Sequence, residues 1–160
     1  MGMDVQMIVL GTGDWNYEEA FRQAQNQYPG RFAAHMIYSP NLSTAIYGGA
    51  DLFLMPSISE PCGLSQMIAM RYGTIPVVRE TGGLRDSVVP YNKFTGEGTG
   101  FSFANINVQE MTGVLSEAVN LYHNEPKAWK ALQKNAMTAD FSWEKSAKAY
   151  EEIYGWVTGK

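Results

Sequence analysis

A single cysteine stands among the 160 residues of this chain, so no disulfide can form within it. One thiol and no apolar run of transmembrane length favour a cytoplasmic protein and exclude a disulfide-stabilised secreted fold. Basic residues are also scarce, because 12 lysines and arginines face 16 aspartates and glutamates, for a net charge of −4. That balance provides no electrostatic basis for binding nucleic acid or an anionic membrane, so we expect neither as a partner.

What the chain does contain is a regular alternation of short apolar runs and amphipathic segments. Its length and its 45% share of hydrophobic residues suit one globular domain over residues 1–160. The apolar runs predict five strands, at residues 5–11, 32–38, 51–56, 75–80 and 101–103. Segments with helical spacing follow these runs, which predicts an α/β fold: a Rossmann-like parallel sheet with helices on both faces. The first strand is expected to be buried on both faces.

The last third of the chain predicts a helical C-terminal tail. Asn107 and Glu110 form a start resembling a capping box, Pro126 suits a first helical turn, and Ser142 can cap a final helix. That final helix carries an apolar stripe made of Trp143, Ala147, Tyr150, Tyr154 and Val157. We expect the tryptophans at helical spacing and the nine methionines to belong to the core.

Unusual loops follow four of the predicted strands, at residues 11–14, 38–40, 57–65 and 80–84. Right-handed crossovers bring the loops after parallel strands to one edge of the sheet, where ligands of such folds bind. Glycines let these loops approach a ligand closely, and the helix after Gly63 points its N-terminal amides at the same edge. The edge therefore suits a phosphorylated or diphosphate ligand.

The same residues admit plainer interpretations. Glycine after a strand is commonly just a turn, and “GTG” is not a complete dinucleotide fingerprint. Glu60 could be a solvated acid or a cap for the next helix, and Glu60 with Glu80 could imitate a glycosidase pair. Cys62 could be an activated nucleophile, although an ordinary small loop residue is favoured. His35 and His123 are expected to be structural, and no cluster in the sequence has metal-ligand spacing.

A more specific signal lies in residues 50–88. They contain “EPCGL-x-Q”, then “YGT-x-PVVR”, then “TGGL-x-D”, in this order. The segment closely resembles the C-terminal domain of bacterial glycogen synthase and plant starch synthase. Weaker similarity extends through “LGTGD”, “IYGGAD”, “GTGF” and “FSWEKSAKAYEEIY”, and so covers almost the whole chain.

The resemblance implies a fold, a reaction and partners. Enzymes of this family are two-domain GT-B glycosyltransferases whose active site lies in the cleft between the domains. They transfer glucose from ADP-glucose to the non-reducing end of an α-1,4-glucan, and they retain the anomeric configuration. The chain would be the C-terminal half, which binds ADP-glucose or ADP, while an N-terminal domain holds the glucan acceptor. The family implies neither a metal nor a redox cofactor.

The resemblance also implies roles for individual residues. Glu60 matches the catalytic-site acid that hydrogen-bonds the donor glucose. Cys62 and Gly63 match a turn whose amides meet the sugar hydroxyls, and Leu64 and Ser65 open the helix whose amides hold the distal phosphate. The remaining donor-site residues are Tyr38, matching an aromatic that stacks on adenine, and a loop made of Thr81, Gly82 and Gly83.

Two features depart from the family pattern. Ile68 stands where related retaining transferases carry a second glutamate, although the synthases themselves vary there. The family's phosphate-neutralising arginine and lysine should lie upstream of Asp4, so we expect the chain to begin too late to contain them and to lack the N-terminal domain. We therefore expect a fragment of a longer enzyme that makes no glucan alone. Two alternatives stay open: another retaining GT-B transferase with a different nucleotide sugar, and a non-catalytic module that binds a nucleotide or glucan.

Overall fold

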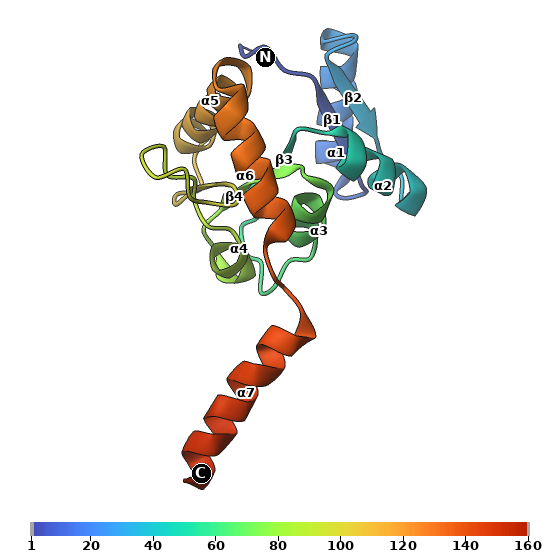
Figure 1. Cartoon of the computed structure of the whole chain (residues 1–160). Helices are drawn as coiled ribbons and strands as arrows, with labels where there is room; N and C mark the ends of the chain where they lie inside the picture. The colour runs from blue at the N-terminus through green and yellow to red at the C-terminus, as the bar shows by residue number, and fades with distance from the viewer. Residues whose placement is uncertain (1, 160) are drawn as a thin grey trace.

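The computed structural model describes residues 2–159 and alternates strands with helices as the sequence predicts (Figure 1). The strands are β1 (Met7–Leu10), β2 (Phe32–His35), β3 (Leu52–Met55), β4 (Ile75–Arg79) and β5 (Phe101–Phe103). The helices are α1 (Trp15–Gln27), α2 (Pro40–Gly49), α3 (Ser65–Tyr72), α4 (Gly82–Ser87), α5 (Val108–Asn124), α6 (Pro126–Thr138) and α7 (Trp143–Thr158). All five predicted strands are present, and the α/β fold with parallel strands is confirmed.

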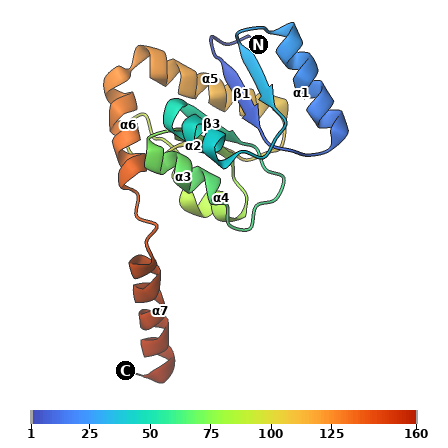
Figure 2. The same ribbon diagram turned by 90° about the vertical axis from the view of Figure 1, so that its right-hand side faces the viewer.

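The strands form two separate parallel sheets instead of one. β1 pairs with β2, while β4 lies between β3 and β5. Among residues 2–159 no ladder joins β1 to β3, so each of these two strands keeps one edge without a β partner. Figure 2 shows the smaller sheet with α1 at one side of the domain and α6 at the opposite side. The larger sheet therefore carries most of the core.

The core is built around β4. Its residues Ile75 to Val78 are all buried, although successive side chains of a strand point to opposite faces. Such a strand needs cover on both faces, and α3, α4, α5 and α6 all contact it. The apolar cluster consists of Met70, Ile75, Val77, Val78, Leu84, Val88, Phe101, Ala118, Leu121, Trp129, Leu132 and Ala136.

The smaller sheet is less well covered than the sequence predicts. Met7 and Ile8 of β1 are 37% and 40% exposed, so the expectation of burial on both faces is wrong for this strand. The physical reason is that β1 has one paired edge and that, within residues 2–159, α1 is the one helix that packs closely on this sheet, through the stacked rings of Phe21 and Phe32. The expectation that all nine methionines belong to the core is likewise wrong for Met7 and Met137, and Met1 lies outside the described residues.

The predicted helix starts are confirmed. Asn107 Oδ1 accepts a hydrogen bond from the Glu110 amide at 2.8 Å, and Glu110 Oε1 accepts one from Asn107 Nδ2 at 3.2 Å. The backbone amide of Asn105 also donates to the Glu110 carboxylate, and this bond lowers the pKa of Glu110. Because the charged form is stabilised in the fold, that stabilisation is lost as the pH falls through the lowered pKa. Pro126 lies in the first turn of α6, and Ser142 caps α7.

The last helix, α7, projects away from the rest of the domain in both views (Figures 1 and 2). None of its residues is buried, and Trp143 and Trp156 are each 89% exposed. The expectation that the tryptophans at helical spacing are core residues therefore holds for Trp129, at 4% exposure, and is wrong for Trp143. Within the described residues no helix is both long and apolar enough to cross a membrane.

We predict that Leu132→Ala lowers the free energy of unfolding by about 2–5 kcal/mol, because the deletion leaves a cavity in a fully buried site. Urea unfolding followed by circular dichroism measures the change. Lys130→Ala, on the exposed side of the same helix, is the control and should stay within about 0.5 kcal/mol of the parent. Equal effects of the two substitutions would contradict the assignment of the core.

Candidate functional site

The candidate site lies where β3 and β4 end. Met55 of β3 is in register with Val78 of β4, so the loops that follow the two strands leave the same edge of the sheet. The first loop contains residues 56–64 and leads into α3, and the second contains Glu80 and Thr81 and leads into α4. We call them the β3 loop and the β4 loop. Both come from the segment that the sequence singled out.

The β3 loop rests directly on the start of α4. The Gly83 amide donates to the Glu60 carbonyl oxygen at 3.1 Å. A Cβ atom on Gly83 would overlap the carbonyl of Cys62, and one on Gly82 would overlap that of Glu60. Gly82 also has a φ of +44°, which favours glycine. The two glycines are therefore required for this contact, which answers why the motif contains a pair of them.

Two side chains, one from the end of β4 and one from α3, hold the β3 loop near its two ends. Arg79 Nη1 donates to the carbonyls of Ser57 and Ile58, at 3.3 and 2.7 Å. Gln66, fully buried in the first turn of α3, donates from Nε2 to the Gly63 carbonyl at 2.8 Å. The loop is thus tied to the end of β4 before Glu60 and to α3 after it.

The N-terminus of α3 is open toward this loop. Leu64 is the residue that precedes the helix, and no side chain caps the first-turn amides. Helix starts of this kind attract anions because several amides and the positive end of the helix dipole point the same way. The alternative that Glu60 caps α3 is therefore wrong. Glu60 is half-buried, and Cys62 is exposed.

The structure brings together most of the predicted site residues but leaves one apart. Glu60, Cys62 and Gly63 meet Gly82 and Gly83 through the contacts described above, with Ser65 opening α3 and Thr81 preceding α4. Tyr38 lies in the loop after β2, a strand of the other sheet, and its side chain is 88% exposed.

The second acid considered from the sequence, Glu80, has its own partner. Its Oε1 atom accepts a hydrogen bond from Ser102 Oγ at 2.7 Å, and its amide donates to the Phe103 carbonyl. Glu80 is thereby turned toward β5. In the described part of the chain, no group of three or more His, Cys, Asp or Glu side chains could hold a metal ion.

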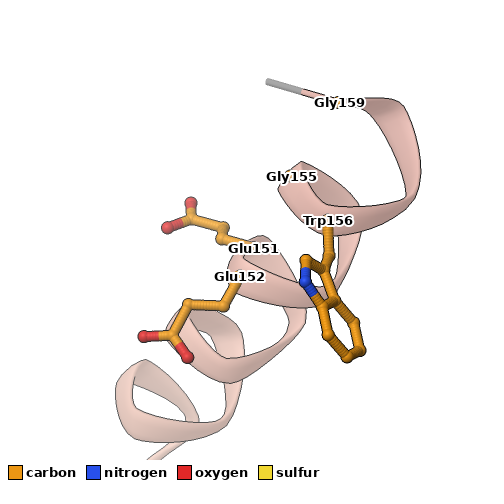
Figure 3. Close-up of a pocket in the computed structure, with 5 residues that line it drawn as sticks. All are labelled: Glu151, Glu152, Gly155, Trp156 and Gly159. Carbon is orange, nitrogen blue, oxygen red and sulfur yellow. The ribbon is translucent and has the colours of Figure 1, made fainter.

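A hollow on the surface of the described residues lies elsewhere, on α7. Figure 3 shows it on α7, with Glu151 and Glu152 projecting to one side of the helix and Trp156 to the other. All its lining residues come from α7 and the glycine that follows it. A hollow with one wall is the outer surface of a single helix, so it does not enclose a ligand.

Sequence reasoning gave no role to three residues of the site, Arg79, Gln66 and Ser87, although Arg79 and Gln66 end two of the quoted motifs. Arg79 and Gln66 each keep a buried polar atom without a hydrogen-bond partner, Nε and Oε1 respectively. A signal existed for Gln66, since it is a polar residue at the start of an otherwise apolar helical run, “QMIAM”. Its orientation toward the loop could not be read from the sequence.

Comparison with known proteins identifies relatives of this chain. The chain is 52% identical over 151 residues to the glycogen synthase of Lachnospira eligens, a match that covers 94% of this chain and 32% of that protein. It is 51% identical over 154 residues to the glycogen synthase of Geobacillus thermodenitrificans, covering 96% of this chain and 32% of that protein. The chain thus spans about one third of the length of these relatives.

Solved structures support the fold. The catalytic domain of starch synthase IV from Arabidopsis thaliana, bound to ADP and acarbose, matches with a TM-score of 0.82 and 37% identity, over 97% of this chain and 33% of that one. Sucrose-phosphate synthase from Thermosynechococcus elongatus matches with a TM-score of 0.66 over 96% of this chain and 39% of that one. At 21% identity the second match shows likeness of fold alone. The predicted fold class, half of a GT-B glycosyltransferase, is confirmed.

The family match covers most of the chain. Residues 1–138 match the family described as glycosyl transferases group 1. This range includes both sheets, the β3 and β4 loops and all helices up to α6. The chain therefore belongs to the glycosyl transferases group 1 family.

Proposed function

We propose that this chain is the donor-binding part of a glycogen synthase that transfers glucose from ADP-glucose to an α-1,4-glucan with retention. The observation that carries the proposal is the contact of the β3 loop with α4 beside the uncapped start of α3. It is supported by about 50% identity to glycogen synthases and by the starch synthase IV structure, which is bound to ADP and acarbose.

The amides of α3 suit the leaving group of this reaction. Breaking the bond between the glucose and the diphosphate leaves negative charge on the phosphate and positive character on the sugar carbon. Fixed amide dipoles that need no rearrangement stabilise such charge. Leu64 and Ser65 open α3, so their amides would meet the distal phosphate.

Glu60 and the turn after it would hold the glucose. The Glu60 carboxylate accepts hydrogen bonds from sugar hydroxyls and so orients the ring for attack. The amides of Cys62 and Gly63 would meet other hydroxyls, in line with a role for Cys62 as part of a turn and not as a nucleophile. Thr81, Gly82 and Gly83 would line the same pocket from the side of α4, where the two loops already touch.

The base and the acceptor would be bound further away. The exposed ring of Tyr38 is available to stack on adenine. The glucan acceptor would be held by other parts of a protein of the length of the relatives, about three times that of this chain.

The test of the proposal is incorporation of labelled glucose into glycogen by a full-length protein that contains this chain. Transfer from ADP-glucose is expected, and transfer from UDP-glucose alone would favour a different donor class.

We predict that Glu60→Gln in that full-length protein lowers kcat by about a hundredfold or more, because the ring loses its charged hydrogen-bond acceptor. Initial rates of glucose transfer measure the effect. The control is Glu80→Gln, in the neighbouring loop, where the amide oxygen can still accept from Ser102; it should stay within about threefold of the parent. A folded Glu60→Gln protein with parental kcat would remove Glu60 from the site.

We predict that Tyr38→Ala weakens ADP binding by about 1–3 kcal/mol, the scale of stacking between a base and an aromatic ring. Tyr38→Phe keeps the ring and should bind ADP almost as the parent does. Isothermal titration calorimetry measures the affinity of both variants for ADP. Phe94→Ala removes an equally exposed ring, 88% in each case, and should leave the affinity unchanged. Parental affinity in Tyr38→Ala would exclude the stacking role.

A further inference from the structure

Gln66 is a fully buried polar residue in the first turn of α3. Its Nε2 atom lies 2.8 Å from the Gly63 carbonyl oxygen, 3.3 Å from that of Cys62 and 2.9 Å from Ser87 Oγ. Burying an amide is unfavourable unless its hydrogen bonds are recovered, and here Oε1 recovers none from the protein. The bonds that Gln66 does make are directed at the turn after Glu60 and at Ser87 of α4.

The hydrogen bonds continue from Gln66 to Glu60 through α4. Ser87 Oγ donates its one proton to the Gly83 carbonyl at 2.6 Å, so its lone pair is free to accept from Gln66 Nε2. The Gly83 amide in turn donates to the Glu60 carbonyl. Gln66 is therefore bonded directly to the turn that follows Glu60, and through Ser87 and Gly83 to Glu60 itself.

The packing around Gln66 leaves this turn little freedom. Gly63 has a φ of +72°, and a Cβ atom there would lie 2.6 Å from Gln66 Oε1. The turn and the side chain thus fit one another at contact distance. Because α3 starts two residues after Gly63, any shift of the turn also moves the first-turn amides.

We propose that Gln66 and Ser87 are positioning residues for the transfer reaction, a proposal that rests on the proposed function. They contact no substrate atom. Through its Nε2 atom, Gln66 fixes the Cys62–Gly63 turn relative to the first-turn amides of α3. Ser87 accepts a hydrogen bond from the same Nε2 atom and so links α4 to this turn. Glu60 and the phosphate-binding amides are thereby held in one geometry. A displacement of about 1 Å at a reacting group can cost up to roughly a hundredfold in rate.

The test uses the full-length protein with Gln66→Met, Ser87→Ala and the double substitution. Gln66→Met keeps the length of the side chain and removes its hydrogen bonds. We expect it to lower kcat by roughly tenfold to a hundredfold while the KM for glucan stays within about twofold. Ser87→Ala should lower kcat less, by about threefold. The double variant should be no slower than Gln66→Met, because both act through one hydrogen-bond chain.

A matched control lies at the other end of α3. Gln133 Nε2 donates to the Gly73 carbonyl at 2.9 Å, and Gly73 is the residue that ends this helix. Gln133→Met therefore removes the same kind of bond from the same helix, away from the site. We expect it to change kcat by less than about twofold even where it lowers the melting temperature as much as Gln66→Met does.

Amide hydrogen exchange of the unliganded protein separates the two proposals. Positioning predicts faster exchange of the Gly83 amide in Gln66→Met and in Ser87→Ala, and parental exchange in Gln133→Met. If the parent protein transfers no glucose from ADP-glucose, the proposed function fails while the exchange data still decide the positioning. Unchanged exchange at Gly83, or equal losses of kcat in Gln66→Met and Gln133→Met, would overturn the inference. Should Gln66→Met fail to fold, Ser87→Ala alone decides in the same way.

Discussion

The site depends on one close contact, in which the backbone of the β3 loop lies on the first turn of α4 without a side chain between them. Gly83 donates to the Glu60 carbonyl, and neither Gly82 nor Gly83 has space for a Cβ atom. The parallel register of β3 and β4 brings the loops to the same edge. Arg79 and Gln66 then hold the β3 loop on each side of Glu60. With larger residues in place of Gly82 and Gly83, the β3 loop could not take this position on α4.

Backbone groups provide most of what this site offers a ligand. The start of α3 presents uncapped amides, and the turn at Cys62 and Gly63 is shaped by its positive φ and by the Gln66 side chain. Backbone donors are fixed by the fold, so they cost no rearrangement when charge develops on a leaving group. Glu60 would add the one carboxylate directed at the sugar.

Local features of the sequence predicted much of the fold and part of the site. Hydrophobic periodicity and residue types with strong local preferences predicted the five strands, the caps at Asn107 and Ser142, and the loops at the edge of the sheet. Long-range features were not accessible in this way. The separation of β1 from β3 and the exposure of Trp143 depend on which surfaces meet, and no local pattern encodes that. The role of Gln66 is of the same kind, because its partner Ser87 is 21 positions away.

The most direct test of the close contact is Gly83→Ala in the full-length protein. The φ of Gly83 is not in the left-handed region, so only the overlap with the Cys62 carbonyl distinguishes alanine from glycine there. Gly113→Ala, in α5 with open space around it, is the control. The account predicts that Gly83→Ala loses at least about tenfold in kcat/KM for ADP-glucose, while Gly113→Ala keeps the parental value. Parental kcat/KM in Gly83→Ala would contradict the account.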